Sequence, residues 1–209
     1  MIRIAVVNLK GGSGKTTTTG MLAAAFHESG FPTLGVDADG ENKSLQGWQE
    51  AADLPFPVTT QAVSNLHVVL PGVIGDRFEV AVCDTPPMKA QRGTVLSALR
   101  WCTHAIVPLA PSPVERDRLP AVKELLDEAA SLRPDGRPPY FAAFLIKCKA
   151  RSASPAVYRE LIEEEDKIPV LKAQVPDRER FVQAWGSPIR RASLTAFGDA
   201  AMELMELGN

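Results

Sequence analysis

Two lysines flank a glycine-rich turn near the start of the chain, in the segment LKGGSGKTT at positions 9–17. The glycines of this turn are Gly11, Gly12 and Gly14. They let the loop wrap so that its backbone N–H groups point inward at phosphate oxygens. Lys15 can then reach the β- and γ-phosphates of a nucleotide, and the Thr16 hydroxyl can ligate Mg²⁺. The spacing predicts a phosphate-binding loop, or P-loop, but it leaves the role of Lys10 open.

Three aspartates follow apolar runs elsewhere in the chain. Asp37 and Asp39 come at the end of the run TLGVDAD, and Asp84 ends the run FEVAVCD. Ligands of parallel sheets bind at the carboxyl ends of the strands, so these carboxylates are expected beside the glycine-rich loop. Asp37 and Asp84 are suited to the outer shell of Mg²⁺, and Asp39 is suited to orienting an attacking water. Together with the loop they predict a Mg-nucleotide site.

The elements that must position these residues are short apolar runs alternating with longer amphipathic ones. Strands are expected at residues 2–8, 33–39, 66–72, 78–84, 104–110, 140–146 and 170–176. Helices are expected at residues 16–29 and 117–132, the second with Asp117 as its N-cap and Pro120 in its first turn. This alternation predicts an α/β fold of the P-loop NTPase type, a mostly parallel central sheet with helices on both faces. Residues 1–209 are expected to form a single domain.

Composition narrows the class of protein. The formal net charge is −2, so contact with nucleic acid requires a local basic patch. Three cysteines without CxxC spacing favour a reducing compartment and argue against a metal site built from them. The N-terminus lacks the pattern of a signal peptide, and no apolar run approaches the roughly 20 residues of a membrane span. We therefore expect a cytoplasmic protein.

The loop departs from the general P-loop pattern, because Leu9 stands where that pattern has its first glycine. The segment KGGSGKTT instead resembles the deviant Walker A motif, KGGxGKTT, of the ParA/MinD superfamily. GVDADGENKSLQGW, VAVCDTPP, AIVPLAPSPVERDRL and QVPDRERFVQAWGSPI are similar to later segments of the same superfamily. The resemblance covers the whole chain and points to the ParA-type partition ATPases, in the short form without a helix-turn-helix domain.

This resemblance implies ATP and Mg²⁺ as cofactors and an ATP-dependent homodimer. Its nucleotide-binding residues would be Lys10, Gly11, Gly12, Ser13, Gly14, Lys15, Thr16 and Thr17. Lys10 would reach across a two-fold interface to the partner's phosphates, which answers the question of its role. The implied catalytic residues are Lys10, Lys15 and Asp39, and the implied metal residues are Thr16, Asp37 and Asp84. Hydrolysis would be slow and stimulated by a partner protein.

Two places depart from the superfamily pattern. Gly40-Glu41 stands where relatives commonly have Pro-Gln, and Lys147 follows the run 140–146 where many carry Asn or another polar residue near the adenine. The backbone around Pro176 and Asp177 is the candidate for adenine recognition.

The C-terminal segment AFGDAAMELMELGN is acidic and lacks Lys and Arg, which disfavours docking on an anionic membrane. The resemblance therefore predicts partition of a plasmid or chromosome through non-specific DNA binding on the nucleoid, with a ParB-like partner. The candidate DNA-binding residues are Arg178, Arg180, Arg190 and Arg191. The alternatives are an adaptor ATPase that positions a non-DNA cargo and, more remotely, an amidoligase-like biosynthetic enzyme.

Overall fold

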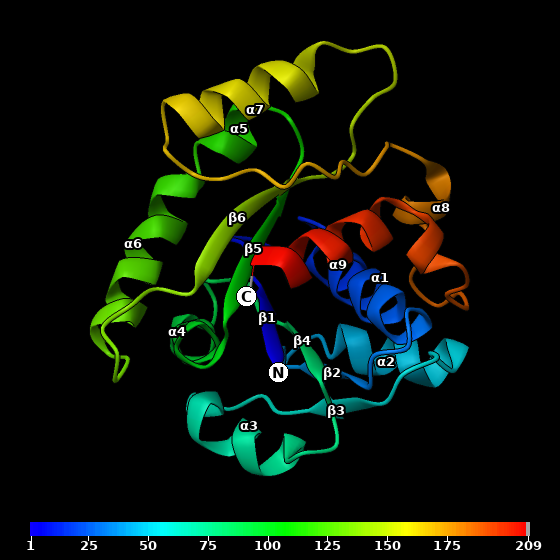
Figure 1. Cartoon of the computed structure of the whole chain (residues 1–209), viewed down its shortest axis with the longest axis vertical. Coiled ribbons are helices and arrows are strands. Elements are labelled where there is room, and N and C mark those ends of the chain that lie inside the picture. Colours follow the sequence, from blue (N-terminus) through cyan, green and yellow to red (C-terminus); the bar gives the residue numbers. More distant parts are fainter. Residues whose placement is uncertain (208–209) are drawn as a thin grey trace.

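The computed structural model describes residues 1–207, and within them a six-stranded sheet runs through the molecule with all paired strands parallel (Figure 1). The strand order is β3-β2-β4-β1-β5-β6. The strands are β1 (Ile2–Val6), β2 (Thr33–Asp37), β3 (Val58–Thr60), β4 (Val80–Asp84), β5 (His104–Leu109) and β6 (Tyr140–Leu145). The predicted mostly parallel sheet is confirmed, and β1, which leads into the glycine-rich loop, lies inside it between β4 and β5.

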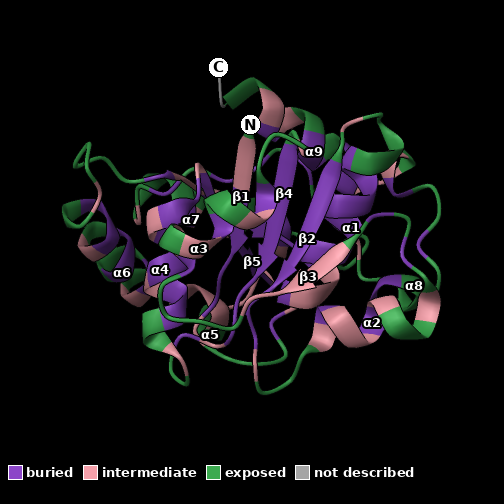
Figure 2. Cartoon of the chain, turned by 90° about the horizontal axis from the view of Figure 1, so that it is seen from below, coloured by how far each residue is buried: buried purple, intermediate pink, exposed green. Residues whose placement is uncertain are grey.

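Helices cover both faces of this sheet, as Figure 2 shows by the buried strands between them. One face carries α1 (Lys15–Glu28), α2 (Ser44–Ala52), α8 (Glu179–Val182) and α9 (Ala196–Leu207). The other carries α3 (Leu66–Ile74), α4 (Arg92–Trp101), α6 (Leu119–Ser131) and α7 (Ser154–Glu164). Two short helical segments, α5 (Pro113–Arg116) and η1 (Ala192–Leu194), lie in the connections.

The apolar runs of the sequence are continuous because both faces of the strands are covered. In β1, Ile4 and Val6 pack into the core beneath α1 and α9, whereas Ala5 packs into the core beneath α4 and α6. All three side chains are fully buried. The alternation follows from the two-residue period of a strand, and it fixes the register in which β1 delivers the glycine-rich loop.

The strand predicted at residues 66–72 is wrong, because these residues form helix α3. Leu66, Leu70 and Ile74 are spaced by four residues and are all buried, whereas Val68 between them is 64% exposed. A four-residue spacing places side chains on one helical face, and the apolar content of the run hid this period. The sheet takes its edge strand from β3 instead, a three-residue strand that the sequence analysis missed.

The strand predicted at residues 170–176 is also wrong as a continuous element. The segment lies beside β6 and the residues that follow it, where isolated parallel bridges pair Val170 with Ala143 and Pro176 with Cys148. Between these bridges, the backbone N–H groups of Lys172 and Ala173 donate to the Glu203 carboxylate of α9 instead of to the sheet. The ladder is therefore interrupted at Lys172 and Ala173, and it resumes where the backbone N–H of Val175 donates to the carbonyl oxygen of Leu145.

The two helices that the sequence predicted are present with small shifts. α1 occupies residues 15–28, followed by Gly30 at a φ of 92°, and α6 occupies residues 119–131. Pro120 lies in the first turn of α6 as expected. The predicted cap is wrong, since Arg118 occupies the N-cap position and Asp117 ends the short helix α5.

Gly20 on α1 gives a test of how α1 packs against α2. A Cβ added at Gly20 would lie 2.7 Å from the ring of Trp48, which is fully buried. Gly20→Ala should therefore lower the free energy of unfolding by about 1–3 kcal/mol, despite the better helix propensity of alanine. Gly72→Ala is the matched control on α3, because nothing lies within 4 Å of its added Cβ. Urea unfolding should show the control equal to the parent or more stable by up to about 1 kcal/mol. Equal effects at the two positions would contradict the packing.

Candidate nucleotide-binding site

Three strands bring their carboxyl ends to the same level of the sheet. In the ladders that join β1, β2 and β4, Asp84 is paired with Val6 on one side and with Asp37 on the other. Asp37 and Asp84 thus end adjacent strands directly beside the start of the glycine-rich loop. The predicted convergence of these aspartates on one sheet edge is confirmed.

The loop between β1 and α1 requires glycine at two positions. Gly12 and Gly14 have φ values of 73° and 84°, in the left-handed region that side chains rarely adopt. Gly14 occupies the N-cap position of α1, and none of the side chains in residues 1–207 caps this end of the helix. The backbone donors in the first turn of α1 are therefore available to an anion, as they are in phosphate-binding loops.

The two lysines of the loop differ in their surroundings. Lys15 is 7% exposed, and its Nζ lies 3.2 Å from the carbonyl oxygen of Lys10, to which it donates. Burial lowers the pKa of Lys15, while the nearby carboxylates of Asp84 and Asp39 oppose that shift. Lys10 is exposed. One lysine is thus held inside the loop, and the other is presented to the surroundings.

Thr16 and Asp84 form the pair predicted to hold Mg²⁺. The Thr16 hydroxyl donates to Asp84 Oδ2 at 2.6 Å, which ties the first turn of α1 to the end of β4. Asp84 Oδ1 is buried and has no hydrogen-bond partner within residues 1–207. Burial raises the pKa of Asp84 to about 7, and the Thr16 hydrogen bond acts against that shift. A hydroxyl and a carboxylate oxygen lacking a partner fit the oxygen ligands and ordered waters that Mg²⁺ prefers.

Asp37 has a structural task in addition to its predicted one. Its Oδ2 accepts hydrogen bonds from the backbone N–H groups of Leu45 and Gln46, each at 2.9 Å, in the first turn of α2. Its Oδ1 accepts from the backbone N–H of Asp39 at 3.0 Å. Burial raises the pKa of Asp37, and these hydrogen bonds oppose the shift. Its carboxylate therefore fixes the start of α2, and its place in the outer shell of Mg²⁺ stays a prediction.

Asp39 is held by the loop that follows β2. The side chain of Asn42 donates to its Oδ2 at 2.9 Å, and the backbone N–H of Asn42 donates to its Oδ1 at 3.2 Å. Asp39 is 7% exposed and lines a cavity above the glycine-rich loop. A carboxylate fixed in this way can hold a water on its remaining lone pairs.

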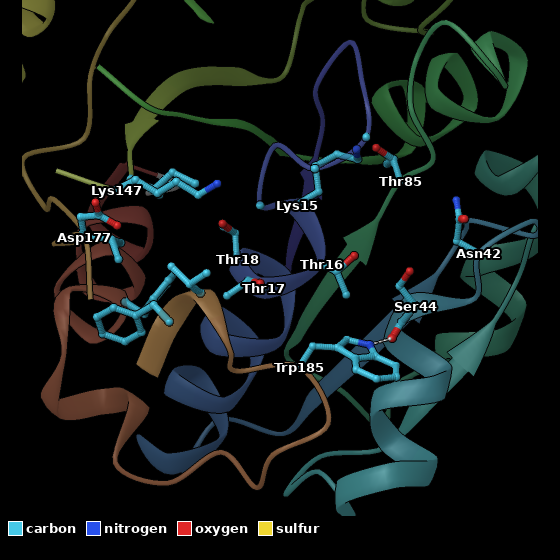
Figure 3. A pocket seen from close by; sticks show the side chains of 18 of the residues that line it. Lys15, Thr16, Thr17, Thr18, Asn42, Ser44, Thr85, Lys147, Asp177 and Trp185 are labelled. Atoms are coloured by element: carbon cyan, nitrogen blue, oxygen red, sulfur yellow. Dashed lines mark hydrogen bonds between the residues drawn. The ribbon is translucent and has the colours of Figure 1, made fainter. Parts of the chain in front are cut away.

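That cavity has a volume of about 430 Å³ and extends from the loop toward α8 (Figure 3). Its lining includes the predicted residues Gly11, Gly12, Gly14, Lys15, Thr16, Thr17, Asp39, Pro176 and Asp177. The predicted residues Lys10, Ser13, Asp37 and Asp84 lie outside this lining, the last two beneath it at the strand ends. The volume is in the range of sites for small-molecule ligands and cofactors.

Sequence reasoning missed much of the cavity wall. The lining residues not assigned there include Thr18, Asn42, Ser44, Thr85, Pro87, Ile146, Val175, Phe181, Val182, Trp185 and Phe197. Lys147, noted only as a departure near the adenine, also lines the cavity. Asn42 lies in the loop after β2 and Ser44 begins α2 directly after that loop, where the Gly40-Glu41 departure could have marked them. Phe181 and Trp185 come from α8 and the segment after it, which reach the cavity only through the tertiary fold.

The four arginines predicted to bind DNA are exposed but do not share one environment. Arg178 lines the nucleotide cavity. Arg180 lies over the ring of Phe181, 4.6 Å from its centroid, and with Arg190 lines a second hollow of about 450 Å³. Arg191 lies at the start of η1. The DNA-binding role of these residues stays a prediction.

The buried Asp84 carboxylate gives a pH-dependent test. Its pKa of about 7 lies above the usual value near 3.8, so the folded chain binds more protons than the unfolded chain between these values. Ionised Asp84 therefore costs stability, and this cost grows as the pH rises from about 4 to 7. Without nucleotide and Mg²⁺, Asp84→Asn should be more stable than the parent by roughly 2 kcal/mol at pH 8, and by less than half of that at pH 5. Urea unfolding at both pH values measures this, and a pH-independent difference would contradict the burial cost.

No helix within residues 1–207 is both long enough and apolar enough to cross a membrane.

Comparison with known proteins finds relatives that align with nearly the whole chain. Maintenance of carboxysome distribution protein A from Halothiobacillus neapolitanus is 28% identical over 208 residues, which cover 96% of this chain and 91% of that protein. The protein of the same name from Gloeobacter kilaueensis is 30% identical over 191 residues, covering 90% of this chain and 80% of that protein.

Solved structures share the fold. Cobyrinic acid a,c-diamide synthase from Mycobacterium smegmatis with bound ADP and magnesium has a TM-score of 0.74 at 19% identity, covering 100% of this chain and 97% of that one. Apo McdA from Cyanothece has a TM-score of 0.73 at 16% identity, covering 98% of this chain and 99% of that one. Residues 4–187 match the family model described as the CobQ/CobB/MinD/ParA nucleotide binding domain. The chain therefore belongs to this nucleotide-binding family.

Proposed function

We propose that this chain is a Mg²⁺-dependent ATPase that forms a homodimer around ATP and uses this switch to position a cargo. The observation that carries the proposal is the glycine-rich loop with one buried and one exposed lysine, beside the Thr16–Asp84 pair and a cavity of about 430 Å³. The structurally similar cobyrinic acid a,c-diamide synthase was solved with ADP and magnesium and also with an ATP analogue and magnesium, which supports the same cofactors here.

The residues in and beneath the cavity have different roles in the proposed transfer of the γ-phosphoryl group to water. Lys15 leaves the Lys10 carbonyl and neutralises charge on the β- and γ-phosphates, where burial strengthens its effect. Thr16 and Asp84 are the residues that would hold Mg²⁺, which would supply further positive charge when bound. Asp39 accepts a hydrogen bond from the attacking water and aligns it with the γ-phosphorus, while Asn42 holds the carboxylate in place.

Lys10 gives the dimer its dependence on ATP. An exposed cation beside the phosphates of one subunit can reach the γ-phosphate held by the other. That contact would be sealed from water, where a charge pair is strongest, and it is absent with ADP. A ligand shifts a monomer–dimer equilibrium only through such differential contacts.

The cargo is inferred from the relatives. Two relatives are named for the distribution of carboxysomes, which supports the adaptor hypothesis better than the plasmid or chromosome partition that the sequence analysis put first. We therefore propose that a partner protein links the dimer to a large cargo of that kind and stimulates hydrolysis. Non-specific DNA is proposed as the surface on which the dimer moves.

The function is tested by phosphate release from ATP and Mg²⁺ together with light scattering. Slow release, and a doubled mass with ATP but not with ADP, are expected. A chain that stays monomeric with both nucleotides would contradict the switch. Turnover that depends on a carboxylic acid and an amide donor would favour the amidoligase-like alternative.

Replacement of Lys15 and replacement of Lys10 should cause different defects. Lys15→Ala should lose ATP binding, since the phosphates lose their buried cation. Lys10→Ala should bind ATP as a monomer and neither dimerise nor hydrolyse it. Isothermal titration and light scattering separate the two, with the exposed Lys123→Ala on α6 as the control that keeps parent behaviour. If the Lys10→Ala protein forms ATP dimers and hydrolyses ATP like the parent, the proposed contact of Lys10 across the interface is wrong.

Asp39→Ala should trap the dimer. Binding survives because Lys15 and Thr16 are intact, whereas the water loses its acceptor, so kcat should fall at least about 100-fold. The variant should accumulate as an ATP-bound dimer in light scattering. Turnover at the parent rate would place the catalytic role elsewhere.

Replacing both Arg190 and Arg191 with alanine should weaken DNA binding by the ATP-bound dimer. Each phosphate contact contributes about −0.9 to the slope of log K against log salt, so the slope should flatten by about 2–4 for a dimer. Replacing the exposed Lys123 and Arg137 removes the same charge elsewhere and is the control. Mobility shifts at several salt concentrations measure this slope, and light scattering checks that the variants still dimerise with ATP. Equal slopes for the two double variants would move the DNA surface away from Arg190 and Arg191.

A further inference from the structure

Trp185 is a large apolar side chain that is kept 54% exposed at the wall of the nucleotide cavity. Its indole Nε1–H donates to the carbonyl oxygen of Ser44 at 2.7 Å, as Figure 3 shows. The ring lies against Gly47, where an added Cβ would be 3.4 Å from Cζ2. Trp185 is thus fixed to the first turn of α2 rather than free in solvent.

A second indole bond runs between the same two segments in the opposite direction. Trp48 of α2 donates its Nε1–H to the carbonyl oxygen of Ser187 at 2.8 Å, and its side chain is fully buried. The segment that carries Trp185 is therefore anchored to α2 two residues further on. These two hydrogen bonds fix residues 185–187 against α2, and we call this contact the α2 joint.

The α2 joint lies next to the loop that holds Asp39. Ser44 is the first residue of α2, and it follows Lys43, whose φ of 46° is in the left-handed region that a lysine rarely adopts. Lys43 donates its backbone N–H to the carbonyl oxygen of Asp39 at 2.8 Å, and Asn42 holds the Asp39 carboxylate. A strained turn of this kind persists only when its surroundings fix it.

We propose that Trp185 is a positioning residue for hydrolysis, which holds the start of α2 through Ser44 and thereby keeps Asp39 and Asn42 directed at the attacking water. This inference rests on the ATPase function proposed above. Figure 3 places Trp185 beside Ser44 and apart from Lys147 and Asp177. Its loss should therefore affect the chemical step and not the affinity for ATP.

Trp185→Phe tests the proposal, because it keeps an apolar ring and removes the N–H donor. We expect kcat to fall about five-fold, the factor for the loss of one net hydrogen bond, with the Kd for a non-hydrolysable ATP analogue within two-fold of the parent. Amide hydrogen exchange at residues 39–47 should be faster in the variant even without nucleotide. Leu194→Ala, a truncation of an apolar side chain that is 79% exposed on η1, is the control expected to match the parent in all three measurements.

Two results overturn the inference: an unchanged kcat, or unchanged exchange at residues 39–47. An unchanged kcat together with a raised Kd would make Trp185 a wall of the binding site only. A parent protein that does not hydrolyse ATP would refute the proposed function instead. The exchange comparison would then still decide whether Trp185 holds the loop.

Discussion

The hydrogen bond from Thr16 to Asp84 joins the two parts on which the site depends. It fastens the first turn of α1, which carries the glycine-rich loop, to the end of β4, where the sheet presents its carboxylates. As a consequence, the Asp84 carboxylate is buried, and its second oxygen has no hydrogen-bond partner in the part of the chain that the structure describes. Burial of such a group costs stability unless a cation compensates it, so the same contact that holds the site together makes the site favour a cation.

The second constraint is the way β2 ends. Asp37 satisfies backbone donors at the start of α2, and Asp39, two residues later, faces the cavity. Two carboxylates this close in the sequence can have different tasks because β2 ends at Asp37 and Asp39 lies in the loop that follows. The position of the cavity carboxylate therefore depends on a structural carboxylate beneath it, since Asp37 Oδ1 accepts a hydrogen bond from the backbone N–H of Asp39.

The sequence predicted those parts of the molecule that depend on local pattern. Gly12, Gly14, Lys15 and Thr16 form a motif whose spacing determines a loop, and Asp84 ends a strand that is apolar on both faces. α3 could not be recognised in this way, because Leu66, Val68 and Leu70 also alternate with the two-residue period of a strand, whereas the helical face consists of Leu66, Leu70 and Ile74.

The walls of the cavity depend on contacts between distant residues, and these left no local signal. Trp185 meets Ser44 across 141 positions of the chain, and nothing in either segment specifies that meeting. Residues 170–176 failed as a strand for the same reason. Their apolar run is real, but the competing acceptor is Glu203, far along the chain on α9.

The contact of Glu203 with Lys172 and Ala173 also affects how copies of the chain can meet. An unpaired sheet edge is a template on which another chain can add a strand, and proteins commonly blunt such edges with charge or interruption. Here a carboxylate occupies two backbone donors beside β6, and the opposite edge, β3, is only three residues long. Growth of the sheet from molecule to molecule is disfavoured at both ends. The proposed dimer would therefore meet through surfaces made of side chains rather than through strand edges, and a bound ligand can control a surface of that kind.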